Sequence, residues 1–293
     1  VYAFFAQYAN FGWAPSADDP AVADRPALDR WVLGRLARVE QDADALLGAY
    51  DPTAAARRVL EFFDADVSKW YVRLSRPRFW FEGDDPPADA RAALATLHEV
   101  LVFTARLLAP FAPFVTDWLH RALTGGLEEG ESVHLADYTR PHDEPAAFDE
   151  ALDAAVEAVR RLATLGRAAR EALGINVRQP LGELVAVAPG AGVGAGETDM
   201  GRQLHALTGL LAAELNVKQV RWATSGDALV TLEAKPNFRH LGKRFGKATP
   251  RAAAAVGALS ADALRAFEHG EPVSVHVDGT EHALEPDDLT VLR

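Results

Sequence analysis

Residues 28–52, LDRWVLGRLARVEQDADALLGAYDP, decide the fold class of the first part of the chain. Apolar side chains recur in this stretch at intervals of three and four residues, at Leu28, Val32, Leu36, Val39, Ala43, Leu46 and Tyr50. This spacing places them on one face of an α-helix. Asp51 is a capping residue type and Pro52 suits a first helical turn, so the sequence predicts that one helix ends near residue 50 and another begins at residue 52.

The neighbouring sequence continues this helical pattern in both directions. The apolar stripe runs on through residues 55–74 and stops at Pro77. Further helices are predicted at about 87–108, 113–124 and 146–173, with a short extended run at 132–136 and the end of another helix at 1–12. Five helices with short connections predict an antiparallel α-helical bundle.

After Gly174 the apolar period changes from 3.6 residues to two, which is typical of strands. Strands are predicted at 184–188, 217–223, 229–234, 273–277 and near 290–292, and helices at 199–215 and 251–267. Asp278-Gly279 is a hairpin signal between two of these strands. The fold class is therefore multi-domain, α followed by α+β: a truncated helix end and linker at 1–26, the bundle at 27–174 and a small α+β domain at 175–293.

Length and composition exclude several classes of protein. A chain of 293 residues, 49% apolar and 25% charged, suits about two globular domains. It has no Cys, hence no disulfide and no thiolate metal site, and no apolar run long enough to span a bilayer. A reducing, cytoplasmic location fits. Because the chain starts at Val1 and its only Met is Met200, we expect it to be part of a longer protein.

The charge distribution is uneven. The net charge is −12, which disfavours nucleic acid as a partner, but two stretches contain basic residues and no acidic ones. The first basic segment, residues 69–80 (KWYVRLSRPRFW), carries four cations, and the second basic segment, residues 235–251 (KPNFRHLGKRFGKATPR), carries six. The remaining 264 residues carry a net charge of −22.

No common catalytic or metal-binding pattern is present. Gly190, Gly192 and Ala195 match a dinucleotide fingerprint, but the next strand ends without the acidic residue that would hold a ribose, so a surface loop is the better interpretation. The nine His are scattered, and the carboxylate pairs lie beside prolines in predicted turns. Hydrolase and Walker-type motifs do not occur, so a free-standing enzyme has no site residues to support it.

Both basic segments allow two interpretations. In the first basic segment, arginine interleaved with aromatic residues is typical of single-stranded RNA binding. The other interpretation is structural: Trp70, Tyr71 and Leu74 continue a core stripe, and cations near the end of a helix interact favourably with its dipole. The second basic segment is predicted to be a loop followed by a short basic turn. It is either a solvated surface or a site for an anionic partner.

Several motifs resemble the isoleucyl-tRNA synthetase family of class I aminoacyl-tRNA synthetases. LDRWVLGRL (28–36), AYDPTAAARRVLEFF (49–63), DVSKWYVRLSRPRFW (66–80), LLAPFAPFVTDWLH (107–120) and ESVHLADY (131–138) are similar to its anticodon-binding region. The valyl- and leucyl-tRNA synthetases share these bundle motifs in weaker form, so the equivalent region of one of those enzymes is an alternative. ELNVKQV (214–220) and PNFRHLGKRFGK (236–247) resemble the isoleucyl branch specifically. The resemblance covers nearly the whole chain.

This resemblance implies a non-catalytic part of an enzyme that joins isoleucine to its tRNA using ATP and Mg²⁺. The family's His-Ile-Gly-His and Lys-Met-Ser-Lys-Ser motifs do not occur here, and its editing domain is absent. We therefore expect no catalytic residue, metal site or cofactor in this chain. The expected partners are the tRNA for isoleucine and the missing catalytic and editing domains of the same protein, without a membrane.

The resemblance also suggests which residues bind the anticodon stem-loop. Predicted phosphate contacts are Lys69, Arg73, Arg76 and Arg78, with Trp80 as a stacking ring, and a second phosphate track of Lys235, Arg239, Lys243, Arg244 and Lys247. The alternative is an interaction scaffold in which the aromatic-rich end of the first basic segment packs on another domain and residues 1–11 are an exposed apolar surface. Pairing of the two basic segments with Asp and Glu would favour the scaffold.

Overall fold

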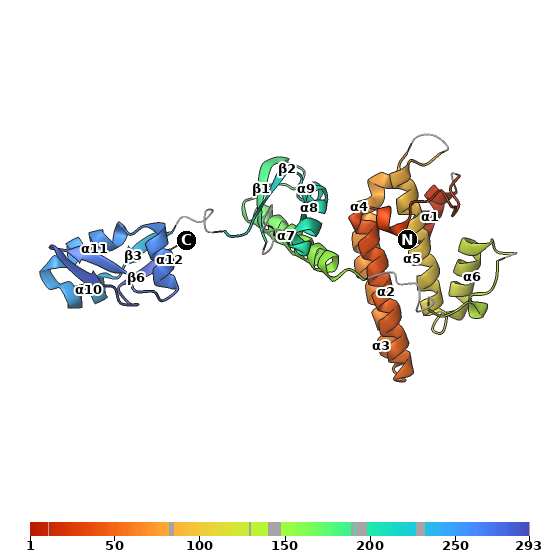
Figure 1. Cartoon of the computed structure of the whole chain (residues 1–293), viewed down its shortest axis with the longest axis horizontal. Helices are drawn as coiled ribbons and strands as arrows, with labels where there is room; N and C mark the ends of the chain where they lie inside the picture. The colour runs from red at the N-terminus through yellow and green to blue at the C-terminus, as the bar shows by residue number, and fades with distance from the viewer. Residues whose placement is uncertain are drawn as a thin grey trace. The chain divides into compact units, whose positions relative to one another are not determined.

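A computed structural model shows two compact units, Val1–Thr224 and Ser225–Arg293, and each is described by itself (Figure 1). The structure describes residues 1–10, 12–81, 85–128, 130–139, 148–188, 191, 198–226 and 232–292. Residues 140–147, and the Gly190, Gly192 and Ala195 positions of the Gly190-x-Gly192-x-x-Ala195 loop, lie outside these ranges, so the predictions made for them are not tested.

The first unit is mostly helical. Its helical segments are α1 (Tyr2–Ala9), η1 (Val22–Asp24), α2 (Ala27–Gly48), α3 (Pro52–Glu61), η2 (Phe62–Val72), α4 (Arg73–Ser75), η3 (Arg76–Phe79), α5 (Ala88–Leu108), α6 (Pro113–Thr124), η4 (Val133–Leu135), α7 (Glu150–Ala172), α8 (Asp199–Ala206) and α9 (Thr208–Leu215). Two strands, β1 (Leu181–Val187) and β2 (Val217–Ala223), complete it.

The boundary between α2 and α3 confirms the sequence-based prediction. The Asp51 side chain accepts a hydrogen bond from the Ala54 amide at 2.9 Å, and Pro52 is the first residue of α3. Between these capping residues and the preceding helix, Tyr50 takes a left-handed backbone conformation with φ of 59°. The chain therefore turns sharply at the place where the apolar spacing of α2 ends.

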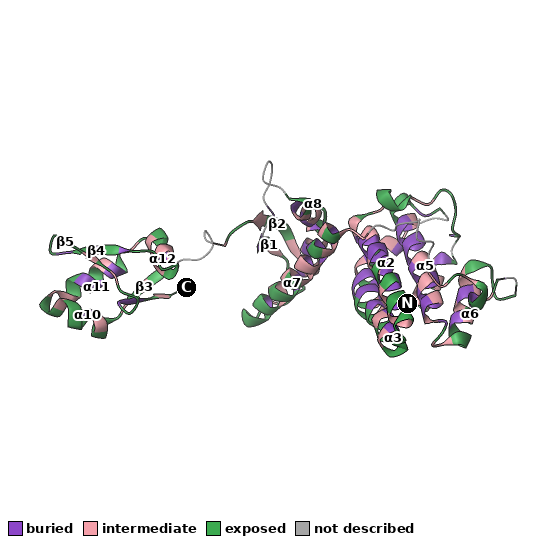
Figure 2. Cartoon of the chain, turned by 60° about the horizontal axis from the view of Figure 1, so that its bottom comes forward, coloured by how far each residue is buried: buried purple, intermediate pink, exposed green. Residues whose placement is uncertain are grey.

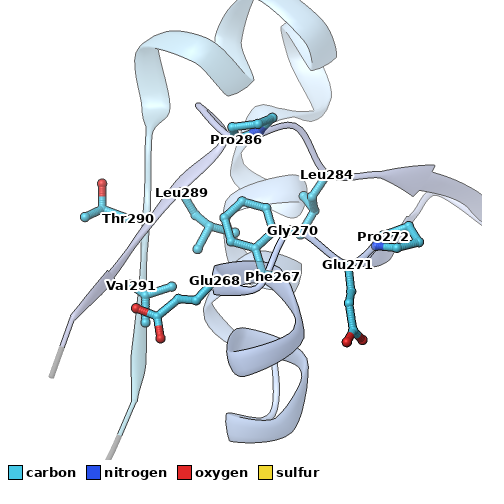
Figure 3. Close-up of a pocket in the computed structure, with 10 residues that line it drawn as sticks. All are labelled: Phe267, Glu268, Gly270, Glu271, Pro272, Leu284, Pro286, Leu289, Thr290 and Val291. Atoms are coloured by element: carbon cyan, nitrogen blue, oxygen red, sulfur yellow. The ribbon is translucent and has the colours of Figure 1, made fainter.

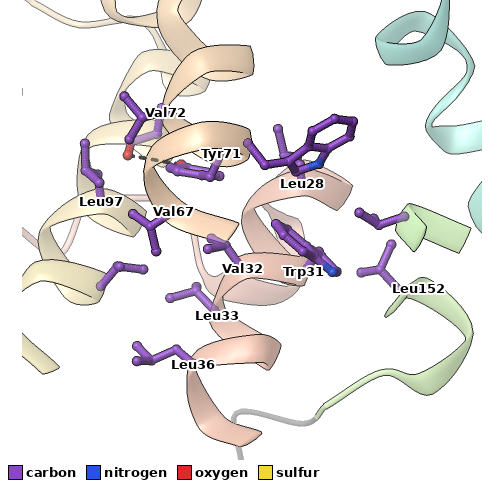
Figure 4. Packing of buried hydrophobic residues seen from close by; sticks show 14 of the residues in the cluster. Leu28, Trp31, Val32, Leu33, Leu36, Val67, Tyr71, Val72, Leu97 and Leu152 are labelled. Atoms are coloured by element: carbon purple, nitrogen blue, oxygen red, sulfur yellow. Dashed lines mark hydrogen bonds between the residues drawn. The ribbon is translucent and has the colours of Figure 1, made fainter. Parts of the chain in front are cut away.

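The core of the first unit forms where the apolar stripes of its helices meet. Figure 4 shows Val32 and Leu36 of α2 packed with Val67 and Leu97 of neighbouring segments, and all four are completely buried. Figure 2 shows buried residues, in purple, along both α2 and α5. Phe5 of α1 is also buried in this core, so residues 1–10 are not the exposed apolar surface that the scaffold interpretation expects.

Two local predictions differ from the structure. The stretch that follows α3 continues as a π-helix over Phe62–Val72, whose wider turn apolar spacing alone does not distinguish from an α-helix. Residues 132–136 are not extended: Val133–Leu135 form a 3₁₀ turn that the Ser132 hydroxyl caps by accepting a hydrogen bond from the His134 amide.

The division between the two units lies at residue 224 rather than at residue 174. Strands β1 and β2 pair in parallel, joined through α8 and α9, and these two helices pack on α7. A Cβ atom on Gly166 of α7 would lie 2.5 Å from the Leu215 side chain, so glycine permits the close approach of α7 and α9. The buried Arg170 of α7 donates hydrogen bonds to the Leu215 and Asn216 carbonyls, which attaches residues 175–224 to the first unit.

The second unit combines helices and strands around its own core. It contains β3 (Glu233–Pro236), α10 (Phe238–Phe245), η6 (Gly246–Ala248), α11 (Thr249–Gly257), α12 (Ala261–Glu268), β4 (Ser274–Val277), β5 (Thr280–Ala283) and β6 (Leu289–Leu292). β3 pairs antiparallel with β6, and β4 with β5. Asp278 and Gly279 both have positive φ, so the predicted turn is confirmed. Its second strand is β5 and not the predicted strand near 290–292, which is β6 and pairs with β3. Leu241, Val256 and Leu289 are buried in the core.

Candidate nucleic-acid interface

The first basic segment follows the helical run from the end of η2 through α4 to η3. Its core stripe is confirmed, because Trp70 and Tyr71 are buried. The cations on the other faces of this run decide whether the segment can bind a polyanion.

Arg78 is an internal anchor of the first unit. Its guanidinium group donates two hydrogen bonds of 2.7 Å to Asp29, whose side chain is completely buried, and two more to the Asp89 carboxylate. Burial alone would lower the pKa of Arg78, but its hydrogen bonds and charge interaction with Asp29 outweigh it, so the pKa is raised. Arg78 therefore holds η3 against α2 and α5, and its donors are not free for a phosphate.

Tyr71 completes this buried cluster. Its hydroxyl group donates a 2.7 Å hydrogen bond to the Asp29 carboxylate. Burial, followed by the nearby negative charge of Asp29, raises the pKa of Tyr71 well above its ordinary value. The phenol therefore remains a neutral donor, and Asp29 is balanced by one cation and one hydroxyl group.

Arg73 and Lys69 are also paired with carboxylates. Arg73 donates to both oxygens of Glu214 on α9, at 2.5 and 3.0 Å, and Arg167 of α7 contacts the same carboxylate. The Lys69 amine lies 2.6 Å from the Asp64 carboxylate in a pair that is exposed on both sides. Exposed pairs contribute little to stability, so a phosphate could compete for Lys69 more easily than for Arg73.

Arg76 and Trp80 remain available at the surface. The Arg76 guanidinium lies 5.8 Å from the centre of the Phe4 ring, and no carboxylate in the described part of the chain pairs with it. The Trp80 side chain is 71% exposed, and its indole N–H donates to the Tyr8 hydroxyl. Of the predicted contacts in the first basic segment, these two are exposed without pairing to a carboxylate of the described residues.

The second basic segment is more ordered than the sequence suggested. The predicted loop is wrong: residues 238–245 form helix α10, followed by the 3₁₀ turn η6 and then α11. The Asn237 side chain caps α10 by accepting from the His240 amide, and Gly246, with φ of 52°, ends it. Pro236 ends β3 before α10, and Pro250 lies in the first turn of α11, where proline is tolerated, so neither interrupts a helix.

One buried carboxylate fixes α10 in the second unit. Asp288 is completely buried, and its oxygens lie 2.9 Å from His240 Nδ1 and within hydrogen-bond distance of Arg244. The Glu285 amide donates a further 2.8 Å hydrogen bond to it. Arg244, predicted as a phosphate contact, is therefore a structural group with a side chain only 25% exposed.

Four other predicted cations of the second basic segment are exposed and have no carboxylate partner among the described residues. They are Lys235 on β3, Arg239 and Lys243 on α10, and Lys247 on η6. Arg239 and Lys243 are four residues apart, so they share one face of α10. Phe238, beside them, is 63% exposed. Phe238 was not among the predicted contacts, although its position next to the cation Arg239 is a signal that the sequence offers.

A hollow among the described residues of the second unit has the wrong charge for a phosphate site. It encloses about 590 Å³ and is lined by apolar side chains such as Phe267 and Leu289 (Figure 3). The charged residues among its lining are Glu268 and Glu271, which repel a polyanion. Among the described residues, no cluster of three or more His, Asp or Glu could hold a metal ion. No described helix is both long and apolar enough to cross a membrane.

Comparison with known proteins agrees with the motif resemblance. The chain is 43% identical to an isoleucine–tRNA ligase of Streptomyces avermitilis, 38% to one of Thermus thermophilus and 34% to one of Porphyromonas gingivalis. These matches cover 99%, 99% and 100% of this chain, but 26%, 27% and 24% of the respective relatives, so the chain spans about a quarter of their length. Residues 29–186 match the family model described as the anticodon-binding domain of tRNA ligase. Since that match covers more than half of the chain, the chain belongs to this family of anticodon-binding domains.

Proposed function

We propose that this chain is the part of an isoleucine–tRNA ligase that binds the anticodon stem-loop of the isoleucine tRNA. In this proposal the helices of residues 27–174 form an antiparallel bundle that docks on the stem, and the second unit helps to hold the unpaired anticodon loop. Attachment of isoleucine, with its ATP and Mg²⁺, belongs to a catalytic domain outside these residues, and removal of valine belongs to a separate editing domain.

The observation that carries the proposal is the set of unpaired cations in a chain of net charge −12. A cluster of exposed cations without a counter-charge repels itself, and phosphates relieve that repulsion. The proposed contacts are Arg76 with Trp80 in the first basic segment, and Lys235, Arg239, Lys243 and Lys247 in the second. Arg78 and Arg244 are left out because buried carboxylates occupy them.

The proposal is tested by measuring binding of the 293-residue chain to isoleucine tRNA over a series of salt concentrations. Replacement of Arg239, Lys243 and Lys247 by Ala should reduce the slope of log K against log salt by about 0.7 to 0.9 per lost contact, or about 2 to 3 in total. The matched control replaces Arg57, Arg178 and Lys218, three exposed cations of the first unit, by Ala. It changes the net charge equally and should leave the slope close to that of the wild type.

Two results would contradict the proposal. In one, the slope is unchanged in the Arg239/Lys243/Lys247 variant. In the other, the variant and its control lose the same amount, which would mean that net charge rather than a local contact governs binding. A mismatched tRNA, measured in parallel, separates recognition of the loop from general attraction to phosphates.

A second function, protein docking, is favoured by one specific surface. Helix α6 exposes Phe114 (90%), Val115 (61%) and Trp118 (45%). Adjacent exposed apolar residues commonly mark a protein interface. Such a face would suit another domain of the same synthetase, and this role is compatible with RNA binding elsewhere on the chain.

A further inference from the structure

Helix α10 separates its residues into an inward and an outward arc. At 100° per residue, His240, Leu241, Arg244 and Phe245 fall on one side, and Phe238, Arg239, Gly242 and Lys243 fall on the other. The inward side supplies buried Leu241 and the two groups that contact Asp288. The four outward residues are exposed and include no acidic side chain (Figure 2).

Phe238 occupies the outward arc without a packing role in the described structure. Its side chain is 63% exposed, and no described ring lies against it. An apolar ring beside cations is the combination on which single-stranded nucleic acids stack, because every base has a π-face and every linkage a phosphate. The neighbouring Arg239 guanidinium can add to both interactions.

Gly242 leaves the space next to this ring open. It lies one helical turn after Phe238, on the same side of α10. A Cβ atom at this position would meet nothing within 4 Å, so packing does not require glycine there. Glycine in a helix interior disfavours the helix, and one use that compensates is close approach of the backbone to a ligand.

We infer that the outward arc of α10 binds one unpaired base of single-stranded RNA, with the base stacked on Phe238 over Gly242 and its flanking phosphates held by Arg239 and Lys243. This inference rests on the proposed tRNA-binding function and assigns it a specific contact. A protein partner fits less well, because the arc joins a single ring to unpaired cations and lacks a broad apolar surface. An RNA strand matches both its charge and its ring.

The test uses the 293-residue chain and an RNA hairpin that carries the anticodon loop of isoleucine tRNA. 2-Aminopurine replaces each unpaired loop base in turn, and stacking on a ring quenches its fluorescence. Phe238→Ala should weaken binding by about 5- to 150-fold and remove the quenching at one loop position, whereas Phe238→Trp should preserve both. Phe114→Ala, which removes an even more exposed ring from the first unit, is the matched control.

Gly242→Leu provides an independent variant. Leu favours the helix more than Gly does, so α10 should remain folded while the new side chain covers the ring. Binding should weaken about as much as in Phe238→Ala. If Gly242 has no role in RNA binding, the variant should be more stable and its RNA affinity unchanged, and that result would overturn the inference.

The outcomes distinguish this inference from the proposed function. If Phe238→Ala binds like the wild type while the Arg239/Lys243/Lys247 variant binds weakly, the stacking site is refuted and the phosphate contacts stand. If neither change affects binding, both proposals fall. Equal loss in Phe114→Ala would also refute a stacking site on α10.

Discussion

Replacing Arg78 by Met tests whether this residue is an internal anchor or an RNA contact. The change removes both Arg78 hydrogen bonds from the fully buried Asp29 carboxylate. Among the described side chains, only the Tyr71 hydroxyl still donates to Asp29. Removing one member of a buried ion pair costs about 3 to 5 kcal/mol. Loss of the partly exposed Asp89 contact adds less than about 1 kcal/mol. We expect the free energy of unfolding of the first unit to fall by about 3 to 5 kcal/mol.

Urea unfolding followed by tryptophan fluorescence measures this loss selectively, because all six Trp lie in the first unit. Arg76→Met is the matched control: Arg76 has no carboxylate partner among the described residues, so the cost should stay below about 1 kcal/mol. The double variant Asp29→Asn/Arg78→Met removes the unpaired buried charge and should recover part of the loss.

The anchor interpretation fails if Arg78→Met is no more destabilising than Arg76→Met, or if Asp29→Asn recovers nothing. Under conditions where the variant is folded, its RNA affinity should equal that of the wild type. A loss of affinity with unchanged stability would return Arg78 to the RNA-binding surface.

Two further predictions concern carboxylates that organise loops. Hydrogen bonds from the Ser132 hydroxyl, at 2.6 Å, and from other donors lower the pKa of Asp117 from its ordinary 3.8 to about 2. The ionised Asp117 should therefore stabilise the fold fully above about pH 4, and this stabilisation should disappear as the pH falls to about 2. The stability difference between wild type and Asp117→Asn, measured by urea unfolding, should shrink over that range, and a constant difference would contradict this. Asp288→Ala should destabilise the second unit by about 3 kcal/mol or more and accelerate amide hydrogen exchange in α10, whereas exposed Asp287→Ala should not; equal exchange in the two variants would show that Asp288 does not hold α10.

Local patterns predicted most of the secondary structure. The apolar spacing of residues 28–50 and the Asp51-Pro52 cap determined α2 and α3, because both signals act between residues less than two turns apart. The Asp278-Gly279 hairpin was predictable for the same reason. Helix α10 was not predicted because Gly242 weakens the helical pattern in the sequence. The groups that stabilise the helix in the structure are distant in the sequence: Asp288, for example, lies 48 residues after its partner His240.

The candidate site depended on contacts that no local pattern reveals. Sequence composition identified both basic segments, but Asp29 lies 49 residues before Arg78, and Glu214 lies 141 residues after Arg73. Such distant pairs separate structural arginines from accessible ones. The division at residue 224 has the same origin, since it depends on how α9 packs against α7.

The shared carboxylate of Glu214 has an electrostatic consequence for binding experiments. One negative charge lies between Arg73 and Arg167, whose side chains are 43% and 41% exposed, so this joint keeps a surplus of one positive charge at the surface. Small anions such as chloride gather at such a surplus and exchange with any approaching polyanion. The ionic strength chosen for RNA titrations will therefore set how strongly the surplus charge at Arg73, Glu214 and Arg167 attracts a polyanion.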